Sequence, residues 1–247
     1  MKVRLRVLRS NSTGKREWQA YQVEVGERES VLGALERVRD EQDETLAFRE
    51  GCSAGLCGAC GMLINGSPAL ACATLVSNVA SAQLRLEPLP GFEVVRDLVV
   101  DSKPMHAVTE RMKPYLVQLS PLPEEESEQT PEQHALPAEA AKCLACGCCL
   151  AACPIWQMNR EFIGPAAGVR AYRFLSDNRD EGAAERLAAV GDESTGVWRC
   201  QAVLECSRVC PAGIDVARIM ARWRNALVQA SLGRKGPNGN LRQSGKG

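Results

Sequence analysis

Aromatic residues and histidine are scarce in this chain of 247 residues. Phe, Trp and Tyr make up 4% of it, so a core built on large rings is not expected, and His106 and His134 are the two histidines. The formal net charge is zero, which gives no support for nucleic acid or an anionic lipid surface as a partner. No run of about 18 apolar residues occurs, so no membrane-spanning helix is expected.

Cysteine, by contrast, is abundant, with twelve residues in clusters. A disulfide scaffold is usually a short secreted chain, and the first residues lack the apolar block of a secretory signal. The clustering therefore predicts metal ligation. Zinc sites favour isolated Cys pairs or Cys/His mixtures, and neither histidine is near a Cys cluster, so iron–sulfur chemistry is favoured.

The stretch Cys143–Pro154 has the spacing C-x2-C-x2-C-x3-C-P, which is typical of bacterial ferredoxins with two clusters. In such runs three thiolates bind one cubane and the fourth binds a second cluster. A shorter set, Cys200, Cys206 and Cys210, follows further along the chain. The pattern predicts one [4Fe–4S] cluster on Cys143, Cys146, Cys149 and Cys210, and a second cluster on Cys153, Cys200 and Cys206.

The second cluster lacks one ligand. A complete motif would have a Cys three residues after Cys200, where this chain has Val203, so a [3Fe–4S] cluster is expected. Fewer thiolates and an apolar neighbour also predict a comparatively high potential. Cys148 fits neither motif and is expected to be a small buried residue.

A different cysteine pattern occupies the first half of the chain. Gly51–Cys60 has the plant-type spacing C-x4-C-x2-C, and Cys72 follows. A [2Fe–2S] cluster is therefore predicted on Cys52, Cys57, Cys60 and Cys72. The glycines of the loop allow positive φ, so amide N–H groups should turn toward the sulfurs.

Alternating apolar residues predict strands over 1–9, around Tyr21–Val25 and at Leu84–Pro88, with a turn at 11–15 between the first two. Ser30 should cap a helix that carries Leu32, Leu35 and Val38. Arg96–Asp101 is expected to open a helix toward Tyr115. This order is that of a β-grasp ferredoxin.

The second half has helical patterns at 181–190 and 216–232. We expect an α+β protein with four regions, which are a plant-type [2Fe–2S] domain (1–115), an acidic Pro-rich connector (116–140), an all-helical [4Fe–4S]/[3Fe–4S] domain (141–232) and a flexible basic tail (233–247).

Three cysteine sets in this order resemble the iron–sulfur subunit of succinate dehydrogenase and fumarate reductase, respiratory complex II. Arg96–Asp101, Phe162–Ala167, Tyr172–Phe174, Asp177–Asp180 and Gly196–Trp198 are further family-like strings. The resemblance implies electron transfer between FAD on a flavoprotein subunit and a quinone at a membrane anchor, which in some members carries haem b. It also implies a peripheral place at the cytoplasmic face of a bacterial inner membrane.

By position in the family, the quinone pocket is expected to include Pro154, Ile155, Met158, Gln201, Val203 and Arg224. Members that use ubiquinone commonly have Trp in place of Met158 and His in place of Gln201. The strings at Arg96 and Gly196 are closer to the fumarate reductase branch, so menaquinone is favoured. Arg224 would be a cationic hydrogen-bond donor to the quinone. The direction of the reaction stays open.

The chain carries no G-x-G-x-x-G fingerprint for FAD and no His/Arg constellation for a dicarboxylate, so it is expected to be a subunit without catalysis of its own. Two alternatives remain. One is the electron-wiring subunit of another flavoenzyme, such as a thiol-linked fumarate reductase or a heterodisulfide reductase-type complex. The other is a structural zinc protein.

Overall fold

The computed structural model describes residues 1–10, 13–79, 83–121 and 123–234. It forms two compact units, each built from separate segments of the chain. The first unit comprises Met1–Ser102, Leu144–Gln157 and Val209–Pro211, and the second comprises Lys103–Cys143, Met158–Arg208 and Ala212–Gly247. The sequence pattern predicts four continuous regions, whereas each unit of the structure combines separate segments. The boundaries of the four regions stay a prediction.

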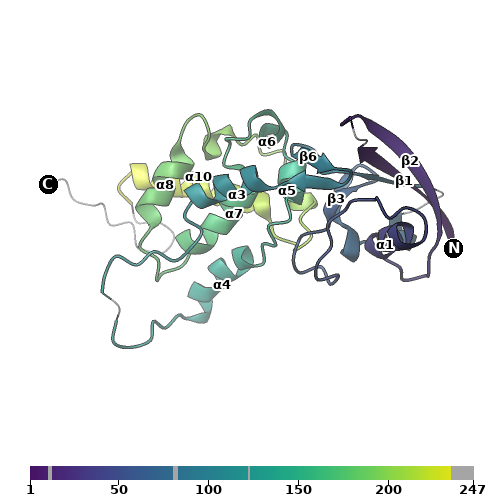
Figure 1. The fold of residues 1–247 in the computed structure, drawn as a ribbon. Helices are drawn as coiled ribbons and strands as arrows, with labels where there is room; N and C mark the ends of the chain where they lie inside the picture. The colour runs from purple at the N-terminus through teal and green to yellow at the C-terminus, as the bar shows by residue number, and fades with distance from the viewer. Residues whose placement is uncertain (11–12, 80–82, 122, 235–247) are drawn as a thin grey trace. The chain divides into compact units, whose positions relative to one another are not determined.

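The first unit is organised on a five-stranded sheet in the order β2-β1-β5-β3-β4 (Figure 1). The strands are β1 (Lys2–Ser10), β2 (Arg16–Glu24), β3 (Gly61–Ile64), β4 (Ser67–Leu70) and β5 (Gln83–Glu87). β1 pairs antiparallel with β2 and parallel with β5. Val3, Leu5 and Val7 are almost fully buried, which confirms the period of two. Residues 11–12 of the predicted turn lie outside the described residues.

Helix α1 (Val31–Glu41) contributes its apolar face to the core of this unit. The Ser30 hydroxyl accepts a hydrogen bond from the Gly33 amide at 3.1 Å and so caps the helix. Leu32, Leu35 and Val38 are buried, as predicted. Short elements complete the unit, namely η1 (Ala71–Ala73), α2 (Val76–Val79) and α5 (Cys148–Ala151), together with most of α6 (Pro154–Met158).

The stretch from Arg96 to Asp101 does not open a helix, and that expectation is wrong. It forms the turn and second strand of a hairpin, β6 (Glu93–Arg96) and β7 (Val99–Asp101), and helix α3 begins only at Lys103. Asp97 makes the turn with a φ of 48° and is fully buried. Its carboxylate accepts the amides of Ser10 and Ala47, and these long-range bonds favour a turn over a helical start.

The second unit is helical. It contains α3 (Lys103–Arg111), α4 (Pro131–Ala141), α7 (Gly164–Leu175), α8 (Ala183–Gly191), η2 (Val197–Arg199), α9 (Glu205–Arg208) and α10 (Val216–Ser231). The indole of Trp223 on α10 is buried and donates to the Gly168 carbonyl on α7 at 2.8 Å. A Cβ on Gly168 would lie 2.6 Å from the Met220 sulfur, so glycine allows these two helices to pack closely.

Helix α4 lies in the stretch that the composition assigns to an irregular connector. Thr130 caps it through the Gln133 amide, Gln133 reciprocates to the Thr130 amide, and Pro131 occupies the first turn. This capping box outweighs the proline content of the segment. Glu124, Glu125, Glu126 and Glu128 precede the helix in irregular, exposed chain. Residue 122 lies outside the described residues.

The family-like string Asp177–Asp180 has a packing role in this unit. Asp180 forms a buried ion pair with Arg186 and accepts the Val117 amide at 2.9 Å. Arg186 also donates to the carbonyls of Lys113 and Tyr115. The string therefore anchors the chain that follows α3.

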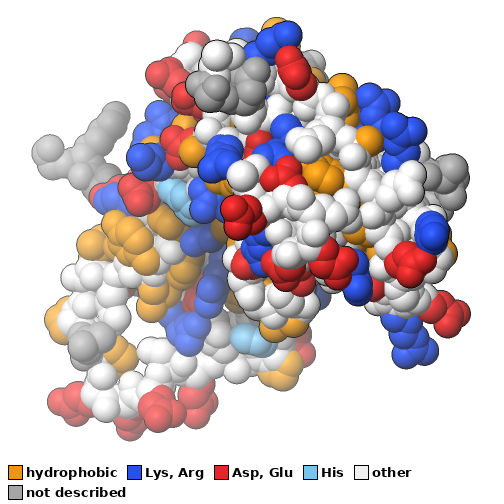
Figure 2. Space-filling view, turned by 45° about the vertical axis from the view of Figure 1, so that its right-hand side comes forward, with side chains coloured by type: hydrophobic (Ala, Val, Ile, Leu, Met, Phe, Trp, Pro, Cys, Tyr) orange, Lys and Arg blue, Asp and Glu red, His pale blue; other side chains and the backbone are white. Residues whose placement is uncertain are grey.

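Basic and acidic side chains are interspersed on the face shown in Figure 2, as the zero net charge suggests. Among the described residues no helix is both long enough and apolar enough to cross a membrane. Residues 235–247, most of the predicted tail, lie outside the described part.

Candidate metal centres

The Gly51–Cys60 loop and η1 bring together cysteines predicted to bind the first cluster. Cys52 and Cys57 are exposed, Cys60 is buried and Cys72 is half-buried. The Sγ atoms of Cys60 and Cys72 are 3.3 Å apart. Exposure of one side of the loop and burial of the other places the set at the edge of the core of the first unit.

Backbone amides of the loop point at these sulfurs, as predicted. Cys52 Sγ accepts from the amides of Ala54, Leu56 and Cys57 at 3.2–3.4 Å. The Gly55 amide donates to Cys72 Sγ at 3.3 Å. Such donors stabilise a negatively charged sulfur, which is the form that iron binds.

Hydrogen bonds and burial also shift the pKa values of these thiols in opposite directions. Hydrogen bonds from Ala54 and its neighbours lower the pKa of Cys52 to about 7. Burial raises the pKa of Cys60 to about 11. A metal overrides this difference because a coordinating thiol is deprotonated outright.

Glycine is required at two bends of the loop. Gly55 and Gly58 have φ values of 72° and 74°, and a Cβ on Gly51 would lie 2.9 Å from Cys57 Sγ. No group of three His, Cys, Asp or Glu side chains in the described part of the chain is arranged around a single metal ion. The fit to a [2Fe–2S] cluster rests on the amide donors and on the room that these glycines leave.

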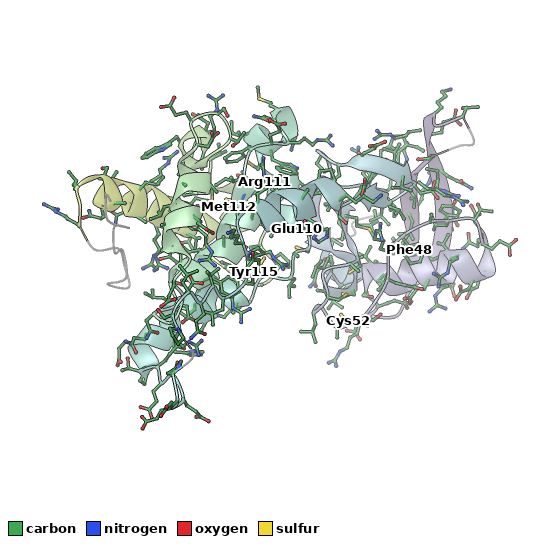
Figure 3. The ribbon with its side chains drawn as sticks, turned by 60° about the vertical axis from the view of Figure 1, so that its left-hand side comes forward. Phe48, Cys52, Glu110, Arg111, Met112 and Tyr115 are labelled. Carbon is green, nitrogen blue, oxygen red and sulfur yellow. The ribbon has the colours of Figure 1, made fainter. Side chains whose placement is uncertain are left out.

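The chain just before the loop is fixed by the β6–β7 hairpin. The Ala47 amide donates to Asp97 at 2.9 Å, and the Leu98 amide donates back to the Ala47 carbonyl at 3.2 Å. Arg49 donates to the Val100 carbonyl at 3.3 Å. Figure 3 shows Phe48 and Cys52, which lie on this irregular segment after α1. The hairpin thus positions the chain that leads to Cys52, the first predicted ligand.

An ionic network centred on the buried Asp97 supports that hairpin. Arg9 pairs with Asp97 at 3.0 Å and with Asp43 at 2.5 Å, and Tyr21 donates to Asp43 at 2.7 Å. Burial acts against charge on Asp43, but hydrogen bonds from Thr45, Tyr21 and Arg9 outweigh it and hold the pKa of that carboxyl well below its usual range. Sequence reasoning missed this network, because no local pattern joins residues so far apart.

The run from Cys143 to Cys153 surrounds α5. Ala145 and Gly147 have positive φ values of 53° and 80°, which fold the chain tightly ahead of the helix. Cys148 is fully buried, as predicted for the spare cysteine. A hydrogen bond with Cys146 and burial, with charge on Cys149 and Cys210, raise the pKa of the Cys148 thiol far above its usual range. Three of the four predicted [4Fe–4S] ligands, Cys146, Cys149 and Cys210, therefore lie around Cys148 in the first unit.

The other predicted ligands of the two later cysteine motifs are divided between the two units. Cys143, Cys200 and Cys206 belong to the second unit, whereas Cys153 belongs to the first. All four are half-buried. The structure does not test their assignment to particular clusters, and it stays a prediction.

The loop after Cys200 has strained backbone and exposed apolar side chains. Ala202 and Leu204 have φ values of 52° and 67°, in the region that favours glycine. Val203 is 52% exposed and Leu204 is 60% exposed. Arg224 on α10 donates to the carbonyls of Val197 and Cys200 and so supports the loop from one side.

The predicted quinone residues differ in exposure. Met158 is 85% exposed, and Gln201, Val203 and Pro154 are also exposed, while Ile155 is half-buried. Arg224 is half-buried and bound to backbone carbonyls. Trp198 in η2 is an exposed aromatic residue, and it belongs to the family-like string Gly196–Trp198.

The comparisons with known proteins agree with both halves of this description. Residues 4–107 match a 2Fe-2S iron-sulfur cluster binding domain, and residues 139–214 match a 4Fe-4S dicluster domain. The chain is thus an α+β protein with a [2Fe–2S] sheet domain and a helical [4Fe–4S] dicluster domain.

Relatives of two names match at similar identity. The fumarate reductase iron-sulfur subunit of Mycobacterium tuberculosis is 39% identical over 87% of this chain and 87% of its own length. The succinate dehydrogenase iron-sulfur subunit of Coxiella burnetii is 37% identical over 81% of this chain and 84% of its own. These values do not separate the two branches.

A chain in the solved structure of the Mycobacterium smegmatis Sdh1 complex in the apo form superposes on this one with a TM-score of 0.85 at 28% identity, covering 94% of this chain and 97% of that one. The fold, the cysteine loops and the relatives lead to one conclusion. This chain belongs to the iron–sulfur subunits of succinate dehydrogenases and fumarate reductases, and it is the electron-transfer subunit of such a complex.

Proposed function

We propose that this subunit passes electrons between FAD of a flavoprotein partner and menaquinone at a membrane anchor, through [2Fe–2S], [4Fe–4S] and [3Fe–4S] clusters in that order. The observation that carries the third cluster is Val203, an apolar side chain at the place where a complete motif would have its thiolate. The complex would lie at the cytoplasmic face of a bacterial inner membrane.

Each cluster has a proposed set of thiolates. The [2Fe–2S] cluster binds Cys52, Cys57, Cys60 and Cys72, the [4Fe–4S] cluster binds Cys143, Cys146, Cys149 and Cys210, and the [3Fe–4S] cluster binds Cys153, Cys200 and Cys206. When bound, such clusters accept and release one electron at a time. The amides of Ala54, Gly55 and Leu56 supply hydrogen bonds that stabilise charge on the first set.

The chain tunes the third site differently from the first. The Val203 side chain has neither a thiolate nor a hydrogen-bond donor, and three thiolates bring less negative charge than four. Lower local charge favours reduction, because the added electron meets less repulsion. The third site is therefore suited to take electrons from the other two and to deliver them to a quinone.

The proposed quinone pocket uses Pro154, Ile155, Met158, Gln201, Val203 and Arg224. The exposed apolar side chains of Met158 and Val203 suit a hydrophobic ring and tail. Arg224 already donates to Val197 and Cys200, and its guanidinium has five N–H donors, so it keeps capacity for a quinone oxygen. Met158 and Gln201 in place of Trp and His favour menaquinone.

The test is Val203→Cys in the assembled complex, with Val203→Ala as the matched control. A thiolate at this position should convert the third cluster toward [4Fe–4S], lower its potential and slow quinone reduction. Low-temperature EPR of the air-oxidised variant should lose the [3Fe–4S] signal, while Val203→Ala should keep it. Retention of the full signal in Val203→Cys would show that this position is not the vacant ligand site.

The quinone is tested separately. Activity of the isolated complex with menaquinone and ubiquinone analogues, measured in both directions, should be higher with the menaquinone analogue. Equal or higher activity with the ubiquinone analogue would contradict the assignment. Neither outcome depends on the type of the third cluster.

A further inference from the structure

Gly58 of the [2Fe–2S] loop and Gly61, which begins β3 directly after it, lie against the backbone of Leu144 and Cys146 in the next cysteine motif. A Cβ on Gly58 would be 2.6 Å from the Leu144 carbonyl oxygen and 2.9 Å from Cys146 Cβ. A Cβ on Gly61 would be 2.9 Å from the Cys146 carbonyl oxygen. Both approaches are closer than a side chain tolerates, so the two backbones meet only because these residues are glycine.

This contact is part of the core of the first unit. Gly58 is buried, and Leu144 and Cys146 pack against the apolar cluster that includes Cys60. Helix α5, which follows Cys146, packs on β4. The contact is therefore fixed by close packing and not by a mobile surface loop.

Leu89 supports the contact from a further side. Its Cδ1 lies 3.4 Å from the Cβ position of Gly61 and 3.4 Å from that of Gly147, and the side chain is 3% exposed. One leucine thus packs against the ends of both cysteine-bearing segments. Its removal would leave a cavity into which they could relax.

We propose that Gly58 and Gly61 are positioning residues that set the electron crossing between the first two clusters. They flank Cys60, a proposed [2Fe–2S] ligand, and bring the chain on either side of it against the backbone of Leu144 and of Cys146, a proposed [4Fe–4S] ligand. In each crossing one cluster loses one electron and the other gains it, and no proton or further reactant is needed. This inference rests on the proposed ligands of these two clusters and not on the type of the third.

The reason for expecting an effect on rate is distance. Electron tunnelling falls steeply with the gap between donor and acceptor, and packed atoms carry it better than an empty space. A methyl group at Gly61 must push the Cys146 carbonyl away, because a contact of 2.9 Å to backbone cannot be relieved by a side-chain rotation. The spacing of the two ligand segments would then increase.

Gly61→Ala in the whole complex is the test, since Gly61 does not have the positive φ that would add backbone strain. Gly26→Ala is its control, because a Cβ there meets only the Glu29 side chain at 3.7 Å. For Gly58→Ala, with φ of 74°, the control is Gly66→Ala, which has φ of 81° and no neighbour within 4 Å. The controls separate steric displacement from backbone strain.

Two quantities are measured, the EPR relaxation of the [2Fe–2S] signal and the rate at which that cluster is reoxidised. In the fully reduced complex, EPR relaxation of the [2Fe–2S] signal reports its distance from the neighbouring paramagnetic cluster. Gly61→Ala and Gly58→Ala should weaken that relaxation enhancement and slow reoxidation of the [2Fe–2S] cluster severalfold, with both clusters present. Gly26→Ala and Gly66→Ala should match the wild type.

Unchanged relaxation and rate in a Gly61→Ala complex that keeps both clusters would overturn the proposal. If that variant does not assemble, Leu89→Ala tests the proposal instead, because it loosens the same contact without introducing a steric clash. It should show a smaller loss of relaxation enhancement, and wild-type relaxation in Leu89→Ala would equally overturn the proposal. A third cluster of [4Fe–4S] type would contradict the proposed function alone.

Discussion

The two cysteine loops of this subunit are built in opposite ways. Gly51–Cys60 bends mainly at glycines, with Ser53 also at positive φ, and turns its own amides toward sulfur. The loop from Cys200 to Cys206 bends at Ala202 and Leu204, which tolerate positive φ poorly, and it exposes Val203 and Leu204. Its described support comes from outside the loop, through Arg224 on α10.

The difference shows two ways of shaping a metal site. The first loop has one non-glycine residue with positive φ, Ser53, but it is rich in backbone donors and backed by a largely buried ionic network, so it is suited to keep one geometry. The second stores strain, of order 1–3 kcal/mol for each such residue, and exposes apolar surface. A strained, exposed loop is suited to a site that is completed by a partner or a ligand.

The largest effect is expected from breaking the support of the first loop at Asp97. Asp97→Asn keeps a residue that tolerates positive φ but leaves Arg9 and the Ser10 and Ala47 amides poorly paired in a buried place. We expect a loss of about 3 kcal/mol in chemical denaturation and a reduced [2Fe–2S] content. Glu93→Gln, on the exposed side of the same hairpin, is the control. Wild-type stability of Asp97→Asn would show that the network does not support the loop.

A smaller effect is expected at the second loop from Arg224→Gln. Loss of the charged hydrogen bonds to Val197 and Cys200 should cost about 2 kcal/mol locally. The oxidised [3Fe–4S] EPR signal should weaken while the [2Fe–2S] signal stays unchanged. Arg218→Gln, exposed on the same helix, should leave both signals intact. If Arg224→Gln weakened both EPR signals equally, Arg224 would not support the second loop specifically, and the prediction would be wrong.

The smallest effect concerns pH and the network behind the first loop. Burial and the hydrogen bond to Asp43 raise the pKa of Tyr21 from 10.0 to about 12. Unfolded chains ionise Tyr near pH 10 and the folded chain resists until about pH 12, so the stability from this group is complete below pH 10 and is lost between these values. Tyr21→Phe should show a shallower alkaline loss of thermal stability than the wild type. Tyr115→Phe, at an exposed position, should behave as the wild type, and identical alkaline curves for Tyr21→Phe would contradict the prediction.

Local patterns in the sequence were enough to predict several strands and the first helix of the first unit, and to define the cysteine sets. The period of two in β1, the Ser30 cap and the cysteine spacing are all short-range signals, and the structure confirms the first two. The β6–β7 hairpin was missed because its turn depends on Asp97 binding Ser10 and Ala47, which are distant in sequence. Helix α4 was missed because proline and glutamate content concealed the capping box at Thr130.

The packing of Gly58 and Gly61 on Leu144 and Cys146 could not be predicted from the sequence either. The glycines were visible, and their need for positive φ was a sufficient local explanation for the loop. Only the folded chain shows that Gly61, which has ordinary φ, is restricted by the Cys146 carbonyl. Close approach between distant segments leaves no periodic pattern to detect.

Low-temperature EPR of the purified wild-type complex, with metal analysis of the same sample, tests the central claim most directly. We predict iron, a [3Fe–4S] signal in the air-oxidised complex and a [2Fe–2S] signal after reduction. The oxidised signal should disappear in Val203→Cys and persist in Val203→Ala. Zinc in place of iron, or an oxidised wild-type complex without a [3Fe–4S] signal, would contradict this assignment of the two cysteine loops.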